Sequence, residues 1–408
     1  MTQALMLLTY NAPVKFLLQP SFFDFMRNNS RRILTRGNFD LPALLVKTTL
    51  TLRSFIKMQK KIIALAIAAA FSAPAFADNA NITVYGKAIL DIETVSNDKS
   101  ALSRATRVQT NASRLGFKGK EDLGDGLSGW FQYEVQFDTD GNNGSGAADG
   151  TRNSGVGLEG GFGTVMLGMW DTPFKVARNK IELFDNTTVF STYNLIGRAN
   201  GGSVNFDTRQ KNVTQYWSPS LGGLKVNLSY SPEEGTTSGT PASANKKQAN
   251  ISAAATYDVD SIYVSAAYET RADASIQDTS DTASRLVARY TMGDMWLGVA
   301  LEAIKVNTSA TASYTQNNTE VAAQYKLGTS SIALSYAKAG ETNLAATGAT
   351  QATLRYGYNF SKRTELFAAY TSLKNDTAGA YGFNGAVKFG SNAGSTQTAM
   401  GAGVVHSF

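Results

Sequence analysis

The chain has 408 residues, a formal net charge of +6 and a sequence pI near 9.2, which at first suggests an anionic partner. It has no cysteine, which excludes a disulfide scaffold, and no run of 18 apolar residues, which excludes a helical membrane protein. Hydrophobic residues make up an ordinary 43% of the chain. The remaining classes are a soluble all-β protein and a membrane β-barrel.

The first recognisable segment is a secretory signal peptide over residues 58–77. After Met58 come two lysines, then an apolar run, then a small-residue site that ends in Ala77. This three-part pattern is typical of a signal peptide and is too short to span a bilayer. We predict cleavage before Asp78, so that residues 78–408 form the mature protein.

Residues 1–57 precede this signal, and we interpret them as a misassigned extension from an upstream start codon. The alternative is an N-terminal anchor in the fairly apolar run Leu41–Leu52, but Lys47 interrupts that run and it is too short to span. Removing residues 1–77 takes ten of the 38 basic and two of the 32 acidic residues, which leaves 28 and 30. The mature net charge is then −2, so nucleic acid is not expected as a partner.

From residue 81 onward, apolar and polar residues alternate with period two in segments of about nine to twelve residues. Leu224, Val226 and Leu228, for example, alternate with Lys225 and Asn227. Successive side chains of a strand point to opposite faces, so each segment predicts a strand with one apolar and one polar face. A soluble sandwich would show the same signal.

The lengths of the connections separate the two folds. Short turns at one rim and long loops at the other are typical of outer-membrane barrels, which in bacteria have an even number of strands. Seven short turns alternate here with eight long connections, which predicts about sixteen strands. The long connections are expected at about 93–110, 139–151, 170–208, 232–247, 272–282, 306–313, 340–348 and 375–397.

Two further patterns support a closed transmembrane antiparallel β-barrel. The last strand ends in Phe408 and should pair with the strand over 82–92, which closes the barrel without free edges. Aromatic residues near strand ends, such as Trp130, Trp217 and Tyr290, are expected at the two membrane–water boundaries. The alternative places these rings in the core of a sandwich.

One segment, from Gly168 to Thr208, loses the alternation for about forty residues. It mixes Phe, Ile, Leu and Tyr with Asp171, Glu182 and Asp185. A loop this long is uncommon in a compact domain and usually has a function. It is too apolar for a solvated linker, so we predict that it folds into the lumen and narrows it.

Three motifs that suggest other chemistry have simpler explanations. The glycines of the G-x-G-x-x-G pattern at 155–160 precede a strand, whereas a dinucleotide site needs a helix there. The acidic stretch over 138–149 resembles a calcium loop but lacks the glycine and glutamate of an EF-hand, so we interpret it as a polar external loop. His406 is the only histidine and there is no cysteine, which argues against a zinc site. It lies two residues from the C-terminus, so we interpret it as an interfacial side chain near a strand end and not as a catalytic base.

Several segments carry a resemblance to a known family. ITVYGKAILDIE at 82–93, SRLGFKGKEDLGDGLSGWFQYEVQFD at 113–138, QYWSPSLGGLKV and the terminal VVHSF occur in this order. Together they resemble the general trimeric porins of Gram-negative outer membranes, in the branch found in Neisseria and related proteobacteria. The resemblance implies a sixteen-stranded trimeric barrel whose third external loop folds inward. It also implies passive passage of ions and small hydrophilic solutes, with no cofactor and no chemical step.

The resemblance also implies a charged constriction in the pore. In the family, a ladder of arginines on the wall faces acidic groups near the inward loop. The matching positions, together with the other acidic residues of the loop, are Arg114, Arg152, Arg209, Glu134, Asp171, Glu182 and Asp185. One position departs from the pattern, because Met169 stands where the family usually has an arginine. From this set we expect a transverse field across the pore and a mild preference for anions.

The alternatives are a barrel selective for one solute class, such as anions or sugars, and a soluble or surface-attached adhesin or lectin. The expected partners are two further copies of the chain in a homotrimer, outer-membrane lipid, and small solutes and ions. The terminal Phe408 is the predicted contact for the barrel-assembly machinery.

Overall fold

The computed structural model describes residues 81–101, 103–140, 148–184, 188–232, 249–383 and 392–408. The chain divides into two units, Met1–Asp78 and Asn79–Phe408. The first unit holds the predicted extension and signal peptide, both of which lie outside the described residues. Among the described residues, no helix has the length and apolar character needed to cross a membrane.

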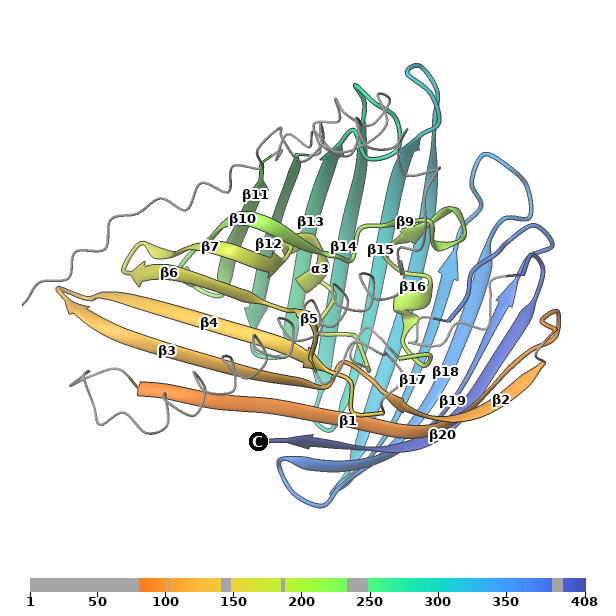
Figure 1. Cartoon of the computed structure of the whole chain (residues 1–408), viewed down its shortest axis with the longest axis horizontal. Coiled ribbons are helices and arrows are strands. Elements are labelled where there is room, and N and C mark those ends of the chain that lie inside the picture. Colours follow the sequence, from red (N-terminus) through yellow and green to blue (C-terminus); the bar gives the residue numbers. More distant parts are fainter. Residues whose placement is uncertain (1–80, 102, 141–147, 185–187, 233–248, 384–391) are drawn as a thin grey trace, which may run out of the picture. The chain divides into compact units, whose positions relative to one another are not determined.

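The second unit is built around one antiparallel sheet that closes on itself (Figure 1). β1 pairs with β20 from Lys87↔Ser407 to Asn97↔Gln397, so the predicted closure is confirmed. The wall strands are β1 (Asn81–Asn97), β2 (Arg104–Thr110), β3 (Arg114–Gly124), β4 (Leu127–Phe137), β5 (Ala148–Thr151), β6 (Ser154–Gly160), β7 (Gly163–Asp171), β10 (Arg209–Trp217), β11 (Leu224–Ser231), β12 (Asn250–Val259), β13 (Ile262–Ala272), β14 (Ser280–Met292), β15 (Met295–Asn307), β16 (Ser313–Leu327), β17 (Ser330–Ala339), β18 (Ala349–Asn359), β19 (Thr364–Asn375) and β20 (Thr396–Ser407).

These eighteen described segments make a wall of sixteen strands. β2 and β3 pair with successive parts of β1, and β5 and β6 pair with successive parts of β4, so each of these two pairs forms one interrupted wall strand. The predicted strand number is therefore confirmed.

Tight turns join the strands at one rim. The loops 260–261, 293–294 and 328–329 each hold two residues, and the first residue of each has a positive φ: 49° at Asp260, 56° at Gly293 and 63° at Gly328. Two-residue hairpins with positive φ match the twist of the paired strands, and Asp and Gly tolerate that backbone better than most residues.

The expected long connection at 93–110 is wrong. β1 continues to Asn97 and β2 begins at Arg104, so most of that range is strand. Its outward face mixes hydroxyls, such as the pair Thr94 and Thr106 at 2.8 Å, with the apolar Val108. Its inward face carries an ion pair between Arg107 and Glu93 at 2.6 Å. Its inward face also carries Val95, so each face mixes polar and apolar residues and the alternation that reveals a strand is hidden.

The described residues of the segment between β7 and β10, 172–184 and 188–208, pack against inward-facing side chains of the wall. The segment contains α3 (Pro173–Val176), the 3-10 turns η1 (Thr192–Asn194) and η2 (Asn200–Gly202), and the short hairpin β8 (Arg198–Ala199) and β9 (Val204–Asn205). In Figure 1, α3 and β9 lie in the space that the wall strands enclose. We call the segment 172–208 the inner loop.

Apolar side chains attach the inner loop to the wall. Phe174 and Phe206 are completely buried and pack against wall alanines of β12–β14 and against Ile304. A second group, including Phe190 and Ile196, packs against alanines of β17–β19 and against Leu373. Small residues on the lumen face leave room for the larger loop side chains, and burying each large one contributes roughly 1.5–3 kcal/mol.

The motifs set aside in the sequence also have structural positions. The glycine pattern lies within β6, and a turn and β7 follow it, so a strand stands where a dinucleotide site needs a helix. In the acidic stretch, Asp140 accepts a hydrogen bond from the Thr110 backbone N–H at 2.9 Å, and 141–147 lie outside the described residues. The His406 ring is exposed, contacts the Thr364 hydroxyl at 2.9 Å and stacks on Phe408.

Candidate functional site

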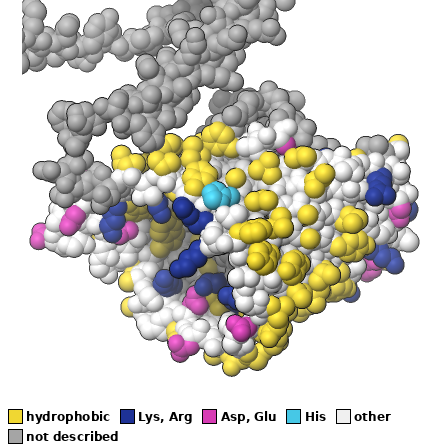
Figure 2. Space-filling model, turned by 90° about the horizontal axis from the view of Figure 1, so that it is seen from below, with side chains coloured by type: hydrophobic (Ala, Val, Ile, Leu, Met, Phe, Trp, Pro, Cys, Tyr) yellow, Lys and Arg dark blue, Asp and Glu magenta, His cyan; other side chains and the backbone are white. Residues whose placement is uncertain are grey.

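Between the inner loop and the wall strands β1–β10 lies a polar cavity of about 670 Å³. Six of the seven predicted site residues line it: Arg114, Arg152, Arg209, Glu134, Asp171 and Glu182. The seventh, Asp185, lies outside the described residues. Figure 2 shows Lys and Arg side chains gathered in a hollow of the face seen from below, while apolar side chains cover much of the surface beside it.

Glu134 on β4 connects the basic groups of the wall. Nε of Arg152 donates to one of its carboxylate oxygens at 2.5 Å, and the Tyr85 hydroxyl donates to the other at 3.1 Å. Nε of Arg114 lies 3.9 Å from that second oxygen. The three charged side chains keep between 10 and 20% of their surface exposed, so their field reaches the water in the cavity.

Asp171 forms a second such centre, where β7 passes into the inner loop. Its carboxylate accepts from Nζ of Lys175 at 2.7 Å, from Nη2 of Arg209 at 3.2 Å and from Nδ2 of Asn153 at 3.0 Å. Nε of Arg209 also donates to the Asn153 side-chain oxygen at 2.6 Å. One carboxylate therefore faces two cations, which leaves a net positive charge at this point of the wall.

The acidic residues on the opposite side of the cavity form ion pairs with arginines that are not part of the cavity lining. Arg178 of the inner loop, almost fully buried, lies 2.6 Å from Glu182, 3.6 Å from Asp207 and 3.0 Å from Glu320 of β16. Burial disfavours its charge, but these three carboxylates outweigh burial and raise the pKa of Arg178, which stays protonated.

Arg285 of β14 extends this network. It contacts Asp207 at 2.8 Å and Glu302 at 2.5 Å, and it lies over the Phe174 ring. Glu182 accepts hydrogen bonds from the Phe184 backbone and the Ser191 hydroxyl. Burial raises the pKa of Glu182, although the guanidinium of Arg178 opposes that shift.

The described lining thus has an asymmetric charge distribution. It contains five cations, Lys87, Arg114, Arg152, Lys175 and Arg209, and four carboxylates, Glu134, Asp171, Glu182 and Asp207. Four of the cations lie on the β1–β10 wall, and the fifth, Lys175 of the inner loop, pairs with Asp171 at the end of β7. The carboxylates of Glu182 and Asp207 lie opposite and contact Arg178 and Arg285. An ion in the cavity would therefore meet positive charge on one side and partly compensated negative charge on the other.

Sequence reasoning missed two of these cations. Lys87 lies on the same face of β1 as Tyr85, and Lys175 follows Asp171 by four residues, a spacing that would have indicated an ion pair across one helical turn. Met169, which stands where the family usually has an arginine, lines a groove with Tyr133, Val156 and Leu167, whose side chains are exposed on the outer face.

Three tryptophans form a cluster on β4, β7 and β10. The ring centroids of Trp130, Trp170 and Trp217 are 5.4–5.8 Å apart. Trp130 shares the lumen face of β4 with Glu134, and Trp217 donates from Nε1 to Gln215, which is buried inside. Placing Trp130 and Trp217 at the membrane boundary was wrong, because closeness to a strand end does not determine the face. Tyr290 is half exposed on the outer face, as expected of a ring facing the membrane.

Within the described residues, no cluster of three or more Asp, Glu, His or Cys side chains is arranged to hold a metal ion. What the site offers is a polar cavity bordered by fixed charges of both signs.

Residues 64–378 match the family described as Gram-negative porin. The chain belongs to the Gram-negative porin family. This porin is 30% identical over 359 residues to outer membrane porin protein 32 of Delftia acidovorans, covering 86% of this chain and all of that one. It is 25% identical over 325 residues to the major outer membrane protein P.IB of Neisseria lactamica, covering 76% and 92%.

Among solved structures, the porin is similar to an anion-selective porin from Comamonas acidovorans, with a TM-score of 0.71 and 26% identity over 81% of this chain and all of that one. Fold, family and relatives agree on function. The protein is an outer-membrane diffusion channel through which ions and small hydrophilic solutes pass.

Proposed function

We propose that this porin is a general diffusion channel with a mild preference for anions. The observation that supports this most is the charge distribution of the cavity. Five cations border it, whereas two of its four carboxylates contact arginines that do not line it. A small anion in transit would meet more uncompensated positive than negative charge. Passage through the pore involves no bond making or breaking.

The constriction is assigned to Arg114, Arg152, Arg209, Glu134, Asp171 and Glu182, with Lys87 and Lys175 added. Their spacing of a few ångströms is shorter than the ~8–10 Å Debye length, so salt screens them poorly. A field across such a pore orders water, favours polar solutes and slows apolar ones.

The second candidate is a channel selective for one solute class. The cations of the cavity, and the anion-selective porin to which the chain is similar, favour anions for this role. Sugars are less favoured. The three lumen tryptophans pack on one another in a compact cluster, whereas stacking on a sugar requires free ring faces along the path.

The functional form is proposed to be a homotrimer, with the long connections outside the cell and the tight turns in the periplasm. The Phe408 ring is about half exposed on the outer wall, and its backbone N–H and C=O both bond to Gly86 of β1 at 3.1 Å. A fixed, exposed terminal ring suits recognition by the barrel-assembly machinery during insertion.

Planar-bilayer recording of the purified porin tests this proposal. In a KCl gradient, we expect a reversal potential with the sign of chloride permeation, weakening as salt rises toward 1 M, where the Debye length falls to about 3 Å. Voltage should close each inserted unit in three equal steps, one for each barrel of a trimer. A reversal potential with the sign of potassium permeation at low salt would contradict the anion preference. A single closing step per inserted unit would contradict the trimer.

Processing gives a second expectation. The natural mature protein should begin at Asp78, because the segment ending Ala75-Phe76-Ala77 has the small-residue pattern of a signal cleavage site. Intact-mass measurement of porin extracted from outer membranes checks this. Recovery of any peptide from residues 1–57 would contradict the misassigned start.

A further inference from the structure

The charged cavity leaves one feature of the lumen unused, the cluster of Trp130, Trp170 and Trp217. Trp130 lies four residues before Glu134 on the lumen face of β4, and Trp217 is the last residue of β10. Both positions are nearer the tight-turn rim than the cavity is. Each of the three rings keeps part of its surface exposed. A solute that has passed the charged cavity would therefore meet an aromatic surface next.

The glycines of β6 make room for this cluster. A side-chain carbon at Gly157 would lie 2.8 Å from the indole of Trp130, and one at Gly155 would lie 2.5 Å from the side chain of Met166. Gly157 pairs with Trp130 across the two strands, so the indole lies over bare backbone. The first glycines of the pattern at 155–160 therefore allow a large ring to lie flat against the wall.

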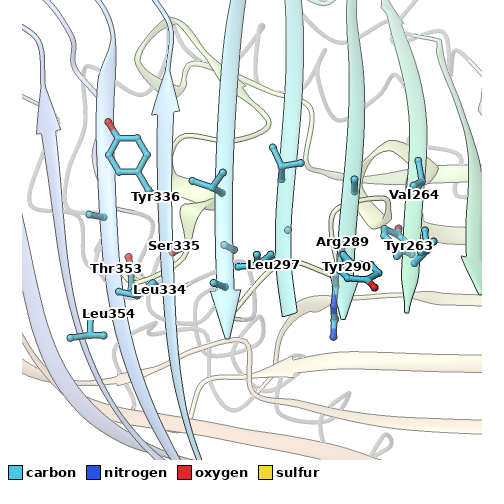
Figure 3. A pocket seen from close by; sticks show the side chains of 18 of the residues that line it. Tyr263, Val264, Arg289, Tyr290, Leu297, Leu334, Ser335, Tyr336, Thr353 and Leu354 are labelled. Carbon is cyan, nitrogen blue, oxygen red and sulfur yellow. The ribbon is translucent and has the colours of Figure 1, made fainter. Parts of the chain in front are cut away.

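A larger apolar surface exists, but a solute in the channel cannot reach it. A hollow of about 950 Å³ on β13–β19 has Leu297, Leu334 and Leu354 in its lining (Figure 3). These three side chains are about half exposed on the outer wall, which faces the membrane. For a solute in transit, the apolar surface to consider is the tryptophan cluster.

A basic strip runs beside the cluster on β3. Arg114, Lys118 and Lys120 are separated by even numbers of residues, so their side chains share the lumen face of this strand. Lys120 is paired with Trp130 in the strand register, and Lys118 is paired with Gln132, one step nearer the cavity. Directly opposite residues have Cβ atoms ~4.5–5.5 Å apart. The ammonium groups can therefore hold one end of a small solute whose other end touches the indoles.

Of the two lysines beside the cluster, Lys118 has the more available charge. Lys120 forms an ion pair with Glu159 of β6. Lys118 is exposed and lies 5.3 Å from the centre of the Tyr85 ring, and it forms no ion pair with another described residue. An ammonium group has three donors, so Lys118 can bind a carboxylate without giving up its contact with the ring.

We infer that this surface is a subsite for aromatic carboxylates. The carboxylate accepts hydrogen bonds from the Lys118 ammonium, and the aromatic ring packs against Trp130 and Trp217. A sugar needs a free ring face, whereas two aromatic rings also pack edge to face, as Trp130 and Trp170 do at 75°. The inference rests on the proposed anion-preferring channel and names the class of anion that the channel retains longest.

Bilayer recording of the chloride current with added potassium benzoate or potassium cyclohexanecarboxylate tests the inference. The two anions have the same charge and similar size, but only benzoate has an aromatic ring. A bound anion obstructs the passage, so each should reduce the chloride current. We expect benzoate to halve the current at a roughly three- to tenfold lower concentration, because a pair of aromatic rings attracts beyond the burial of area. Equal half-reducing concentrations would overturn the inference.

The double variant Trp130→Leu, Trp217→Leu should lose this difference between the two anions. Trp296→Leu is the matched control. Trp296 is the fourth tryptophan of the chain and lies on β15, where it donates to Gln324 and the Arg289 guanidinium covers its ring at 4.6 Å. This variant should keep the preference for benzoate. A preference retained in the double variant, or lost equally in the control, would show that the cluster is not the subsite.

Lys118→Gln tests the role of the charge. Both anions carry the same carboxylate, so this variant should raise both half-reducing concentrations by a similar factor and keep the ratio between them. If neither concentration changed, the carboxylate would not bind at Lys118 and the subsite as inferred would be wrong.

If the double variant failed to fold, tryptophan fluorescence of Trp296→Phe would replace it. The remaining emission comes from the three clustered indoles. Benzoate should change this emission at the concentrations that reduce the current, and emission unaffected by benzoate would overturn the subsite. The reversal potential in a KCl gradient separates the two proposals. A chloride sign together with equal effects of the two anions would overturn the subsite alone, whereas a potassium sign would overturn the anion-preferring channel on which it rests.

Discussion

Replacing Arg114 and Arg152 by glutamine should move the reversal potential of the channel toward cations, with the barrel still assembled. Both guanidinium groups lie within 4 Å of Glu134, so the double variant removes two positive charges and leaves that carboxylate with only the Tyr85 hydroxyl among these partners. A unit charge about 4 Å from an ion contributes ~1 kcal/mol in water, roughly a fivefold change in local ion concentration. The expected change is therefore a reversal of sign at low salt.

Lys305→Gln provides the control, since it removes one positive charge from the outer wall and none from the lumen. It should leave the reversal potential at the wild-type value. Heat-dependent migration of the unboiled protein on SDS gels verifies assembly of each variant. If the Arg114 and Arg152 variant kept the wild-type potential, selectivity would have to come from Lys87, Lys175 and Arg209.

Much of the barrel could be predicted because a membrane strand leaves two independent signals, its alternation and its turns. Alternation fails where the outward face also carries polar residues, as at Thr94 and Thr106, and there the strand was taken for a loop. The number of turns still gave the correct number of strands. A connection does join β1 to β2, although it is shorter than predicted. The tryptophan cluster was predictable in principle, because Trp130 and Glu134 are separated by an even number of residues on one strand.

The site was only partly predictable, for a reason of chain topology. Pairs such as Arg178 and Glu182, four residues apart, can be read from the sequence. The contact between Arg178 and Glu320 joins residues 142 positions apart, and nothing local to Glu320 separates it from other inward acidic residues of the wall. The sequence therefore predicted six of the charged residues that line the cavity and missed Lys87, Lys175 and Asp207. It could not predict which of the lining carboxylates form ion pairs with arginines outside the cavity lining. The sign of the ion selectivity depends on those ion pairs.

The Arg178→Met substitution should have the largest effect on the inner loop. It would leave Glu182, Asp207 and Glu320 without their shared cation in a buried site, and breaking a buried ion pair costs roughly 3–5 kcal/mol. The wall strands hold one another by backbone pairing and do not need this residue. We therefore expect an assembled barrel whose inner loop is loosened, with noisy conductance and closure at lower voltage.

A second substitution separates loss of charge balance from loss of packing. Adding Glu320→Gln to Arg178→Met removes one of the stranded carboxylates and should restore part of the wild-type closing voltage, because less uncompensated charge remains. Arg178→Lys keeps the charge but not the fork that reaches Glu182 and Glu320 together, so it should lie between the wild type and Arg178→Met. Identical closing voltages in Arg178→Met and the wild type would show that the apolar contacts of Phe174, Phe190 and Phe206 hold the loop without the arginine.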